Sequence, residues 1–149
     1  MKIIVDTNIV FSALLNSNSR IGRLLLNPNS SFEFYSCKYL QKEIDRHWSK
    51  IQTYSKLNND DLAELISFVE RRIFFINEEL LPNAIINEAK ELVAGVDFDD
   101  FAFVAITNVL GGRLWTGDKR LMDGLKQKGY KQLISTLEMW ELLDLQRGI

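Results

Sequence analysis

The chain has 149 residues, of which 46% are hydrophobic and 26% are charged, a composition typical of an ordinary globular protein and not of a disordered one. Its single cysteine, Cys37, excludes an intramolecular disulfide and a cysteine-rich zinc site. The formal net charge of −2 does not exclude a nucleic-acid partner, because a cluster of carboxylates at a metal site subtracts several charges locally.

The N-terminal segment gives no sign of a targeting signal. Its apolar run is interrupted by Asp6 within a few residues, whereas a signal peptide needs a longer uninterrupted apolar region. No apolar stretch in the sequence approaches the ~20 residues of a membrane span. We therefore expect a cytoplasmic protein that has no membrane partner.

Short apolar segments alternate with segments of helical periodicity along the whole chain. We predict strands at residues 2–6, 32–36, 73–76, 113–116 and 133–135, and helices at residues 9–15, 21–26, 38–54, 58–69, 82–93, 97–110, 119–128 and 137–146. Such alternation predicts an α/β fold with a central, mainly parallel sheet and helices on both faces. The sequence contains no repeat and no linker, so we expect one domain over residues 1–149.

Two acids directly follow predicted strands. Asp6 comes after the apolar run Ile-Ile-Val, and Asp118 follows Leu-Trp-Thr-Gly. In open α/β sheets, functional sites form outside the carboxyl ends of the strands. Each acid is explained equally well as the N-cap of the helix that follows it, so neither of them alone identifies a site.

A third group of acids, Asp97, Asp99 and Asp100, precedes the most apolar helix of the chain. Asp97 as N-cap with Asp100 three residues later would resemble a capping box. Three acids crowded at the start of a buried helix nevertheless repel one another unless a cation relieves them. A fourth acid, Glu43, lies beside the apolar stripe of its predicted helix. A Glu in that position more often pairs with a nearby base, here Arg46 or His47, than takes part in catalysis.

Carboxylates without soft ligands favour a hard divalent cation such as Mg²⁺ or Mn²⁺. Such a site can activate water and bind a phosphodiester. We expect His47 to be a surface or packing residue, and no nucleotide-binding or zinc-protease motif is present. A phosphohydrolase of the haloacid-dehalogenase type would also place an Asp after the first strand, but it needs a second acid two residues later, where this chain has Asn8.

Four segments together resemble the PIN-domain pattern: VDTNIVFSALL, LQKEID, VDFDDFAFVAI and WTGDKRL. They occur in the order of the family and cover the chain from Lys2 to about Trp140. The branch they resemble contains bacterial toxin components related to VapC-type toxins. The resemblance implies a Mg²⁺- or Mn²⁺-dependent endoribonuclease on a parallel-sheet fold, with RNA as substrate. A toxin role would add a small antitoxin protein as partner.

The resemblance also implies roles for individual residues. The catalytic acids would be Asp6, Glu43, Asp100 and Asp118, and the metal ligands would be Asp6, Asp97, Asp100 and Asp118. Asp97 and Asp99 compete with Asp100 for the third position. Supporting hydrogen bonds to the carboxylates are expected from Thr7, Asn8 and Thr116. Independently of the resemblance, basic residues cluster in the first third of the chain and could guide the RNA strand, among them Arg20, Arg23 and Lys42; the alternative for each of them is a solvated helix face.

Two alternatives stay open at this point. The first is a non-catalytic PIN module that binds RNA or a protein partner. The second concerns assembly, because apolar residues near Trp140 or Phe74 and Phe75 could serve either a homodimer or core packing.

Overall fold

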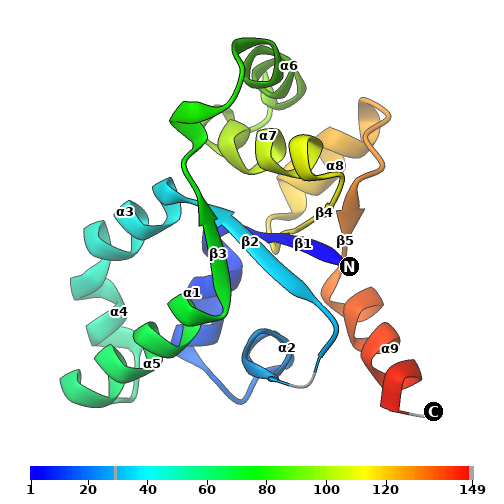
Figure 1. Ribbon diagram of the computed structural model, residues 1–149. Helices are drawn as coiled ribbons and strands as arrows, with labels where there is room; N and C mark the ends of the chain where they lie inside the picture. Colours follow the sequence, from blue (N-terminus) through cyan, green and yellow to red (C-terminus); the bar gives the residue numbers. More distant parts are fainter. Residues whose placement is uncertain (29, 148–149) are drawn as a thin grey trace.

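The computed structural model describes residues 1–28 and 30–147 (Figure 1). In this part of the chain one sheet of five parallel strands runs in the order β3-β2-β1-β4-β5. The strands are β1 (Lys2–Val5), β2 (Glu33–Cys37), β3 (Ile73–Ile76), β4 (Arg113–Trp115) and β5 (Leu133–Ile134). The predicted α/β class with a mainly parallel sheet is confirmed, and the sheet is in fact wholly parallel.

Helices cover both faces of the sheet, as expected (Figure 1). On one face, α7 packs against β1, β2 and β4, and α6 contacts both α7 and α8. These helices are α6 (Asn83–Val93), α7 (Phe101–Leu110) and α8 (Lys119–Gln127). The other face carries α1 (Thr7–Leu15), α2 (Arg20–Leu26), α5 (Asn59–Arg71) and α9 (Thr136–Arg147).

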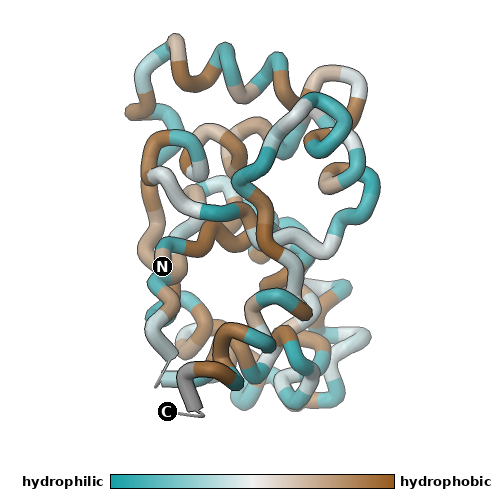
Figure 2. Tube along the Cα trace, turned by 90° about the vertical axis from the view of Figure 1, so that its right-hand side faces the viewer, coloured by the Kyte–Doolittle hydropathy of each residue, from teal (hydrophilic) through white to brown (hydrophobic). Residues whose placement is uncertain are grey.

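The residues of the central strand β1 explain why helices cover both faces of the sheet. Ile3, Ile4 and Val5 of β1 are all fully buried, and a strand buried on both faces is a continuous apolar run and not an alternating one. The outer helices instead show hydrophobic and hydrophilic residues in alternation, as Figure 2 shows for the tube along the chain. In the described part of the chain, no helix combines the length and the apolar character needed to cross a membrane.

The predicted helix over residues 38–54 is wrong in one respect. It is divided into α3 (Lys38–Arg46) and α4 (Trp48–Tyr54) by His47, whose backbone has φ −102° and ψ 16° and so lies outside the helical region. The predicted apolar positions Leu40, Ile44 and Ile51 are nonetheless buried. The change of direction at His47 allows both short helices to pack against α1.

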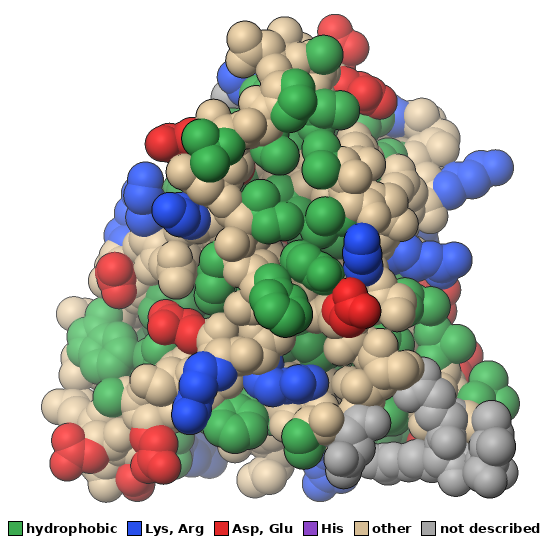
Figure 3. Space-filling model, viewed as in Figure 1, with side chains coloured by type: hydrophobic (Ala, Val, Ile, Leu, Met, Phe, Trp, Pro, Cys, Tyr) green, Lys and Arg blue, Asp and Glu red, His purple; other side chains and the backbone are tan. Residues whose placement is uncertain are grey.

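The apolar residues considered for a homodimer differ in their surroundings. Phe74 on the edge strand β3 is 64% exposed, and its ring lies 5.4 Å from that of Tyr35. Figure 3 shows hydrophobic side chains along the middle of this face. Trp140 is half-buried, with the Arg20 guanidinium over its ring. Assembly into a homodimer stays a prediction.

The strand order of the sheet reverses at one point, between β1 and β4. The chain runs outward from β1 through β2 to β3 and then returns to the other side of β1 to form β4 and β5. The order therefore reverses between β1 and β4. In open α/β sheets, the crevice outside the carboxyl ends of the strands at such a reversal is where ligands bind.

Candidate active site

Asp6 and Asp118 lie at the carboxyl ends of the two strands that flank this reversal. An Asp6 carboxylate oxygen accepts a hydrogen bond from Ile9 N–H at 3.0 Å, and one of Asp118 accepts from Leu121 N–H at 3.1 Å. Both residues are thus N-caps, of α1 and α8. A carboxylate has two oxygens, so capping with one leaves the other available to a ligand. For these acids, capping a helix and facing a site are compatible.

Thr116 connects these two acids. Its side chain is buried, its hydroxyl oxygen accepts a hydrogen bond from Asp118 N–H at 3.0 Å, and its hydroxyl group is also bonded to the Asp6 carboxylate. Because a carboxylate is an acceptor and a hydroxyl carries one proton, the Thr116 hydroxyl must donate to Asp6. A single buried hydroxyl therefore holds the Asp6 carboxylate and the backbone of Asp118.

The acids before α7 are arranged differently from the expectation. Residues 98–100 form a short 3₁₀ turn, and α7 begins only at Phe101. Asp97 is not the N-cap of this helix. Asp100 is in the N-cap position, but its side chain makes no capping hydrogen bond. The capping-box explanation of Asp97 and Asp100 is therefore wrong, and the Asp100 carboxylate makes no capping hydrogen bond.

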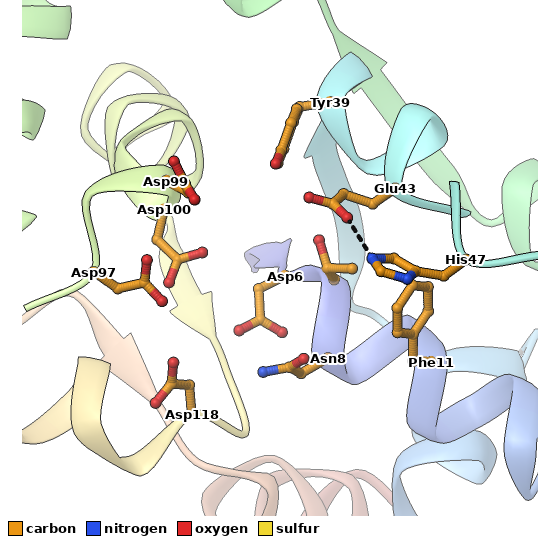
Figure 4. Close-up of a pocket in the computed structure, with 11 residues that line it drawn as sticks. Asp6, Asn8, Phe11, Tyr39, Glu43, His47, Asp97, Asp99, Asp100 and Asp118 are labelled. Atoms are coloured by element: carbon orange, nitrogen blue, oxygen red, sulfur yellow. Dashed lines mark ion pairs between the residues drawn. The ribbon is translucent and has the colours of Figure 1, made fainter. Parts of the chain in front are cut away.

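Asp97, Asp100 and Asp118 form a group of the size that a metal ion requires. Each of them offers one carboxylate oxygen, and these three oxygens all lie within 4.8 Å of one another. Figure 4 shows Asp97 and Asp100 from the turn before α7 and Asp118 from the start of α8 converging from one side. The three acids could hold a metal ion. Asp6 lies outside this group of three and faces it.

The group opens into an acidic pocket at the reversal of the strand order (Figure 4). We use this name for the pocket lined by Asp6, Thr7, Asn8, Phe11, Tyr39, Glu43, His47, Asp97, Asp99, Asp100 and Asp118. The four acids of the sequence prediction thus line one pocket, together with Asp97, Asp99, Thr7 and Asn8. Whether they hold a metal and act in catalysis stays a prediction.

Glu43 lies on the side of the pocket opposite Asp97 and Asp118 (Figure 4). Its side chain is 14% exposed, and one of its carboxylate oxygens lies 3.1 Å from His47 Nε2. The other oxygen lies 3.8 Å from the Arg46 guanidinium. The pairing that the sequence offered as the ordinary explanation for Glu43 is present, and it occurs at the wall of the pocket.

Burial and mutual repulsion disfavour negative charge in this pocket. Burial raises the pKa of Asp6 from 3.8 to about 6, with a further contribution from Asp118 and with hydrogen bonds from Thr116 and the backbone acting against it. Burial also raises the pKa of Asp100 from 3.8 to about 7, reinforced by the charges of Asp97, Asp6 and Asp118. No lysine or arginine is among the described residues that line the pocket. A divalent cation fits such a set of uncompensated oxygen donors.

The predicted basic residues are not part of this pocket. Arg20 lies with its guanidinium 5.7 Å from the centre of the Trp140 ring, and Arg23 lines a separate hollow formed with Trp140 and Leu143. Lys42 is exposed on α3. None of the three lines the acidic pocket, so a role in guiding a strand to it stays a prediction without support from the geometry.

Phe11 and Tyr39 were not predicted as pocket residues. His47 was expected as a surface or packing residue or as a partner of Glu43, and it lines the pocket beside Glu43. Tyr39, Glu43 and His47 are spaced four residues apart, which places them on one side of a helix, and this spacing was a usable signal. The Tyr39 hydroxyl is bonded to Glu43, and this bond is the main reason why the pKa of Tyr39 is raised. The ring of His47 meets that of Phe11 edge-on at 5.7 Å.

Comparison with known proteins shows the family and the fold of the chain. The family model of the PIN domain matches residues 4–139. Among solved structures, the chain is similar to VapBC2 from Rickettsia felis bound to a DNA fragment from their promoter, with a TM-score of 0.62 and 15% identity over 91% of this chain and 97% of that one. At this identity the similarity concerns the fold alone. No protein with a curated description matches the sequence.

The family model covers nearly all of the chain, and the parallel sheet carries its acids at the strand ends where the motifs of the sequence place them. The protein therefore belongs to the PIN-domain family.

Proposed function

We propose that this protein is a divalent-cation-dependent endoribonuclease whose acidic pocket is the active site. One observation carries the proposal: the carboxylate oxygens of Asp97, Asp100 and Asp118 lie within 4.8 Å of one another at the reversal of the strand order. Oxygen donors alone favour Mg²⁺ or Mn²⁺ over softer metals. Membership of the PIN-domain family supports nuclease chemistry at this place in the fold.

The three-acid group would hold the ion, with Asp6 contributing from the other side of the pocket. When bound, the cation supplies positive charge that makes a water a better nucleophile and stabilises the charge that develops on the phosphodiester. Asp6 and Asp118 would be kept in orientation by Thr116, whose hydroxyl contacts both residues. Oriented ligands of this kind tune both the affinity and the reactivity of a metal site.

Glu43 would act on the attacking water. It faces the pocket from α3, on the side away from the three-acid group. Its carboxylate pairs with Arg46 and lies 3.1 Å from His47 Nε2, whereas no ion pair is present at Asp97, Asp100 or Asp118 in the described part of the chain. The lack of an ion pair at the three acids supports a cation there, and the position of Glu43 across the pocket supports its contact with the attacking water.

The proposed substrate and the proposed partner are inferred from similarity to other proteins. RNA as substrate follows from the resemblance to VapC-type toxins, and a small antitoxin as partner is supported by the similarity to a VapBC complex. We also propose that residues 1–149 work as one domain in the cytoplasm. A non-catalytic module that only binds RNA or protein would have the same fold but would not turn over a substrate.

Cleavage of RNA by the purified protein tests the proposal. A fluorescently labelled RNA with single-stranded and paired segments is incubated with wild type, Asp100→Asn and Asp144→Asn, in Mn²⁺ and in chelator. Asp144 is an exposed acid on α9 and serves as the matched control. We expect cleavage by wild type and Asp144→Asn in Mn²⁺ alone, and a loss of about 100-fold or more in Asp100→Asn.

Cleavage that survives chelator, or that is equal in wild type and Asp100→Asn, would contradict the proposal. Retained binding of the RNA without any cleavage by wild type would favour the non-catalytic module. A labelled phosphomonoester included as a second substrate separates a nuclease from a phosphatase.

A further inference from the structure

His47 is the only histidine of the chain and lies at the one residue between α3 and α4. Its carbonyl accepts from Ile51 N–H at 3.0 Å and its own N–H donates to the Glu43 carbonyl at 3.0 Å. The helical hydrogen bonds thus continue across a residue whose backbone is not helical. The change of direction leaves the imidazole at the wall of the acidic pocket, beside Glu43.

The imidazole is held in place from two sides. Its Nε2 lies 3.1 Å from Glu43 Oε2, and its ring meets that of Phe11 edge-on, with the planes at 81°. Phe11 belongs to α1 and is itself packed against the core. The contact with Phe11 therefore connects the histidine, and through it Glu43, to α1, the helix that Asp6 caps.

Three side chains contact the Glu43 carboxylate. His47 reaches one oxygen, the Arg46 guanidinium lies 3.8 Å from the other, and the Tyr39 hydroxyl is also bonded to the group. The Arg46 side chain is 62% exposed, so its contribution is weak because solvent screens it. The His47 side chain is less exposed, at 40%, has the shorter contact and is packed against Phe11, so of these two contacts it restrains the direction of the carboxylate more.

We propose that His47 is a positioning residue of the active site, which holds Glu43 facing the attacking water and so contributes to the rate without binding the metal. This inference rests on the proposed nuclease function. His47 lies on the α3 side of the pocket, across from Asp97 and Asp118. Its removal should therefore change the turnover number and leave metal affinity and RNA binding unchanged.

A double-mutant cycle tests this inference. The variants are His47→Leu, Glu43→Gln and the double variant, with Lys50→Leu as a control that places the same side chain at an exposed position of α4. Residues that orient a catalytic group typically contribute about 10- to 100-fold, so we expect a fall of that size in kcat for His47→Leu. KM for RNA and the Mn²⁺ concentration at half-maximal activity should change by less than about 2-fold.

The cycle shows whether His47 acts through Glu43. In the Glu43→Gln background, His47→Leu should lower kcat by less than about a further 2-fold, because the carboxylate that His47 positions is already lost. His47→Gln retains an N–H donor and should recover part of the rate, which also covers the case in which His47→Leu does not fold. Full activity of His47→Leu, or equal losses in both backgrounds, would overturn the inference.

Two results separate this inference from the proposed function. Absence of Mn²⁺-dependent cleavage by wild type would refute the nuclease proposal and the inference with it. Cleavage by wild type that His47→Leu leaves unchanged would overturn the inference alone. NMR of the imidazole nitrogens gives a further check without cleavage, since a neutral ring with its proton on Nδ1 would contradict donation from Nε2 to Glu43.

Discussion

The buried charge of Asp6 should make the metal-free protein less stable as pH rises. Asp6 is 3% exposed, and burial raises its pKa to about 6 in the folded state. A carboxyl whose pKa is raised on folding stabilises the folded protein while it is protonated, and this contribution is lost as pH rises through the folded pKa. Asp6→Asn removes the charge and keeps a side-chain oxygen that can accept from Ile9 N–H.

The expected change in the free energy of unfolding follows from the shift in the pKa of Asp6. A rise from 3.8 to about 6 corresponds to about 3 kcal/mol between the two ends of the titration. Between about pH 5 and about pH 8, Asp6 alone should lower the free energy of unfolding by about 1.4 kcal/mol. Asp100, whose pKa is raised to about 7, acts in the same direction in both proteins, reduced by its partial exposure to solvent.

Urea unfolding in chelator at the two pH values measures this difference. We expect wild type to lose about 1.4 kcal/mol more than Asp6→Asn between about pH 5 and about pH 8. Groups that titrate alike in both proteins cancel in this comparison. Asp100 cancels only in part, because the Asp6 charge helps to raise its pKa in wild type, and this coupling adds to the difference in the same direction. Saturating Mn²⁺ at the higher pH should reduce the cost of the charge in wild type. The same pH dependence in both proteins would refute the claim that the Asp6 charge is uncompensated.

Two further predictions concern residues that support the pocket. Thr116→Val should lower the free energy of unfolding by about 1 to 2 kcal/mol and weaken Mn²⁺ binding, because the hydroxyl that links Asp6 and Asp118 is lost. Urea unfolding measures the first effect and a Mn²⁺ titration the second. Unchanged values of both would contradict the link. Lys128→Ala should lower the Tm by roughly 2 to 4 °C, because the Lys128 ammonium donates to three carbonyls at and beyond the end of α6. Calorimetry measures this, and an unchanged Tm would show that water replaces the ammonium at no cost.

The sheet could be predicted because its signal is local. Ile3, Ile4 and Val5 form an uninterrupted apolar run and are buried on both faces of the sheet. Parallel strands bring their carboxyl ends to the same edge, so an acid that follows one strand lies near an acid that follows the next. The proximity of Asp6 and Asp118 to the reversal between β1 and β4 could therefore be expected without knowing the order of the other strands.

The break at His47 could not be predicted in the same way. The apolar positions Leu40, Ile44 and Ile51 keep a helical spacing through the break, so their periodicity predicts one continuous helix. The backbone angles of the one residue between α3 and α4 depend on how both helices pack against α1, which is tertiary information. The position of the imidazole in the pocket follows from this break, and it was missed for the same reason.

The acids before α7 show a second limit. Asp97 and Asp100 have the spacing of a capping box, and only the 3₁₀ turn over residues 98–100 shows that the helix starts later. The basic residues Arg20 and Arg23 show a third limit. They are close to Asp6 in sequence, but the nine residues of α1, about 13 Å of helix, lie between them and Asp6. The start of α2 is therefore far from the carboxyl edge of the sheet.

The binding of Mn²⁺ tests the central claim most directly, namely that the acidic pocket holds a divalent cation at Asp97, Asp100 and Asp118. Isothermal titration calorimetry of the metal-free protein with Mn²⁺ should show saturable binding to wild type and to Asp144→Asn. Asp100→Asn should bind at least about 10-fold more weakly. Absence of binding to wild type, or equal binding to wild type and Asp100→Asn, would contradict the account.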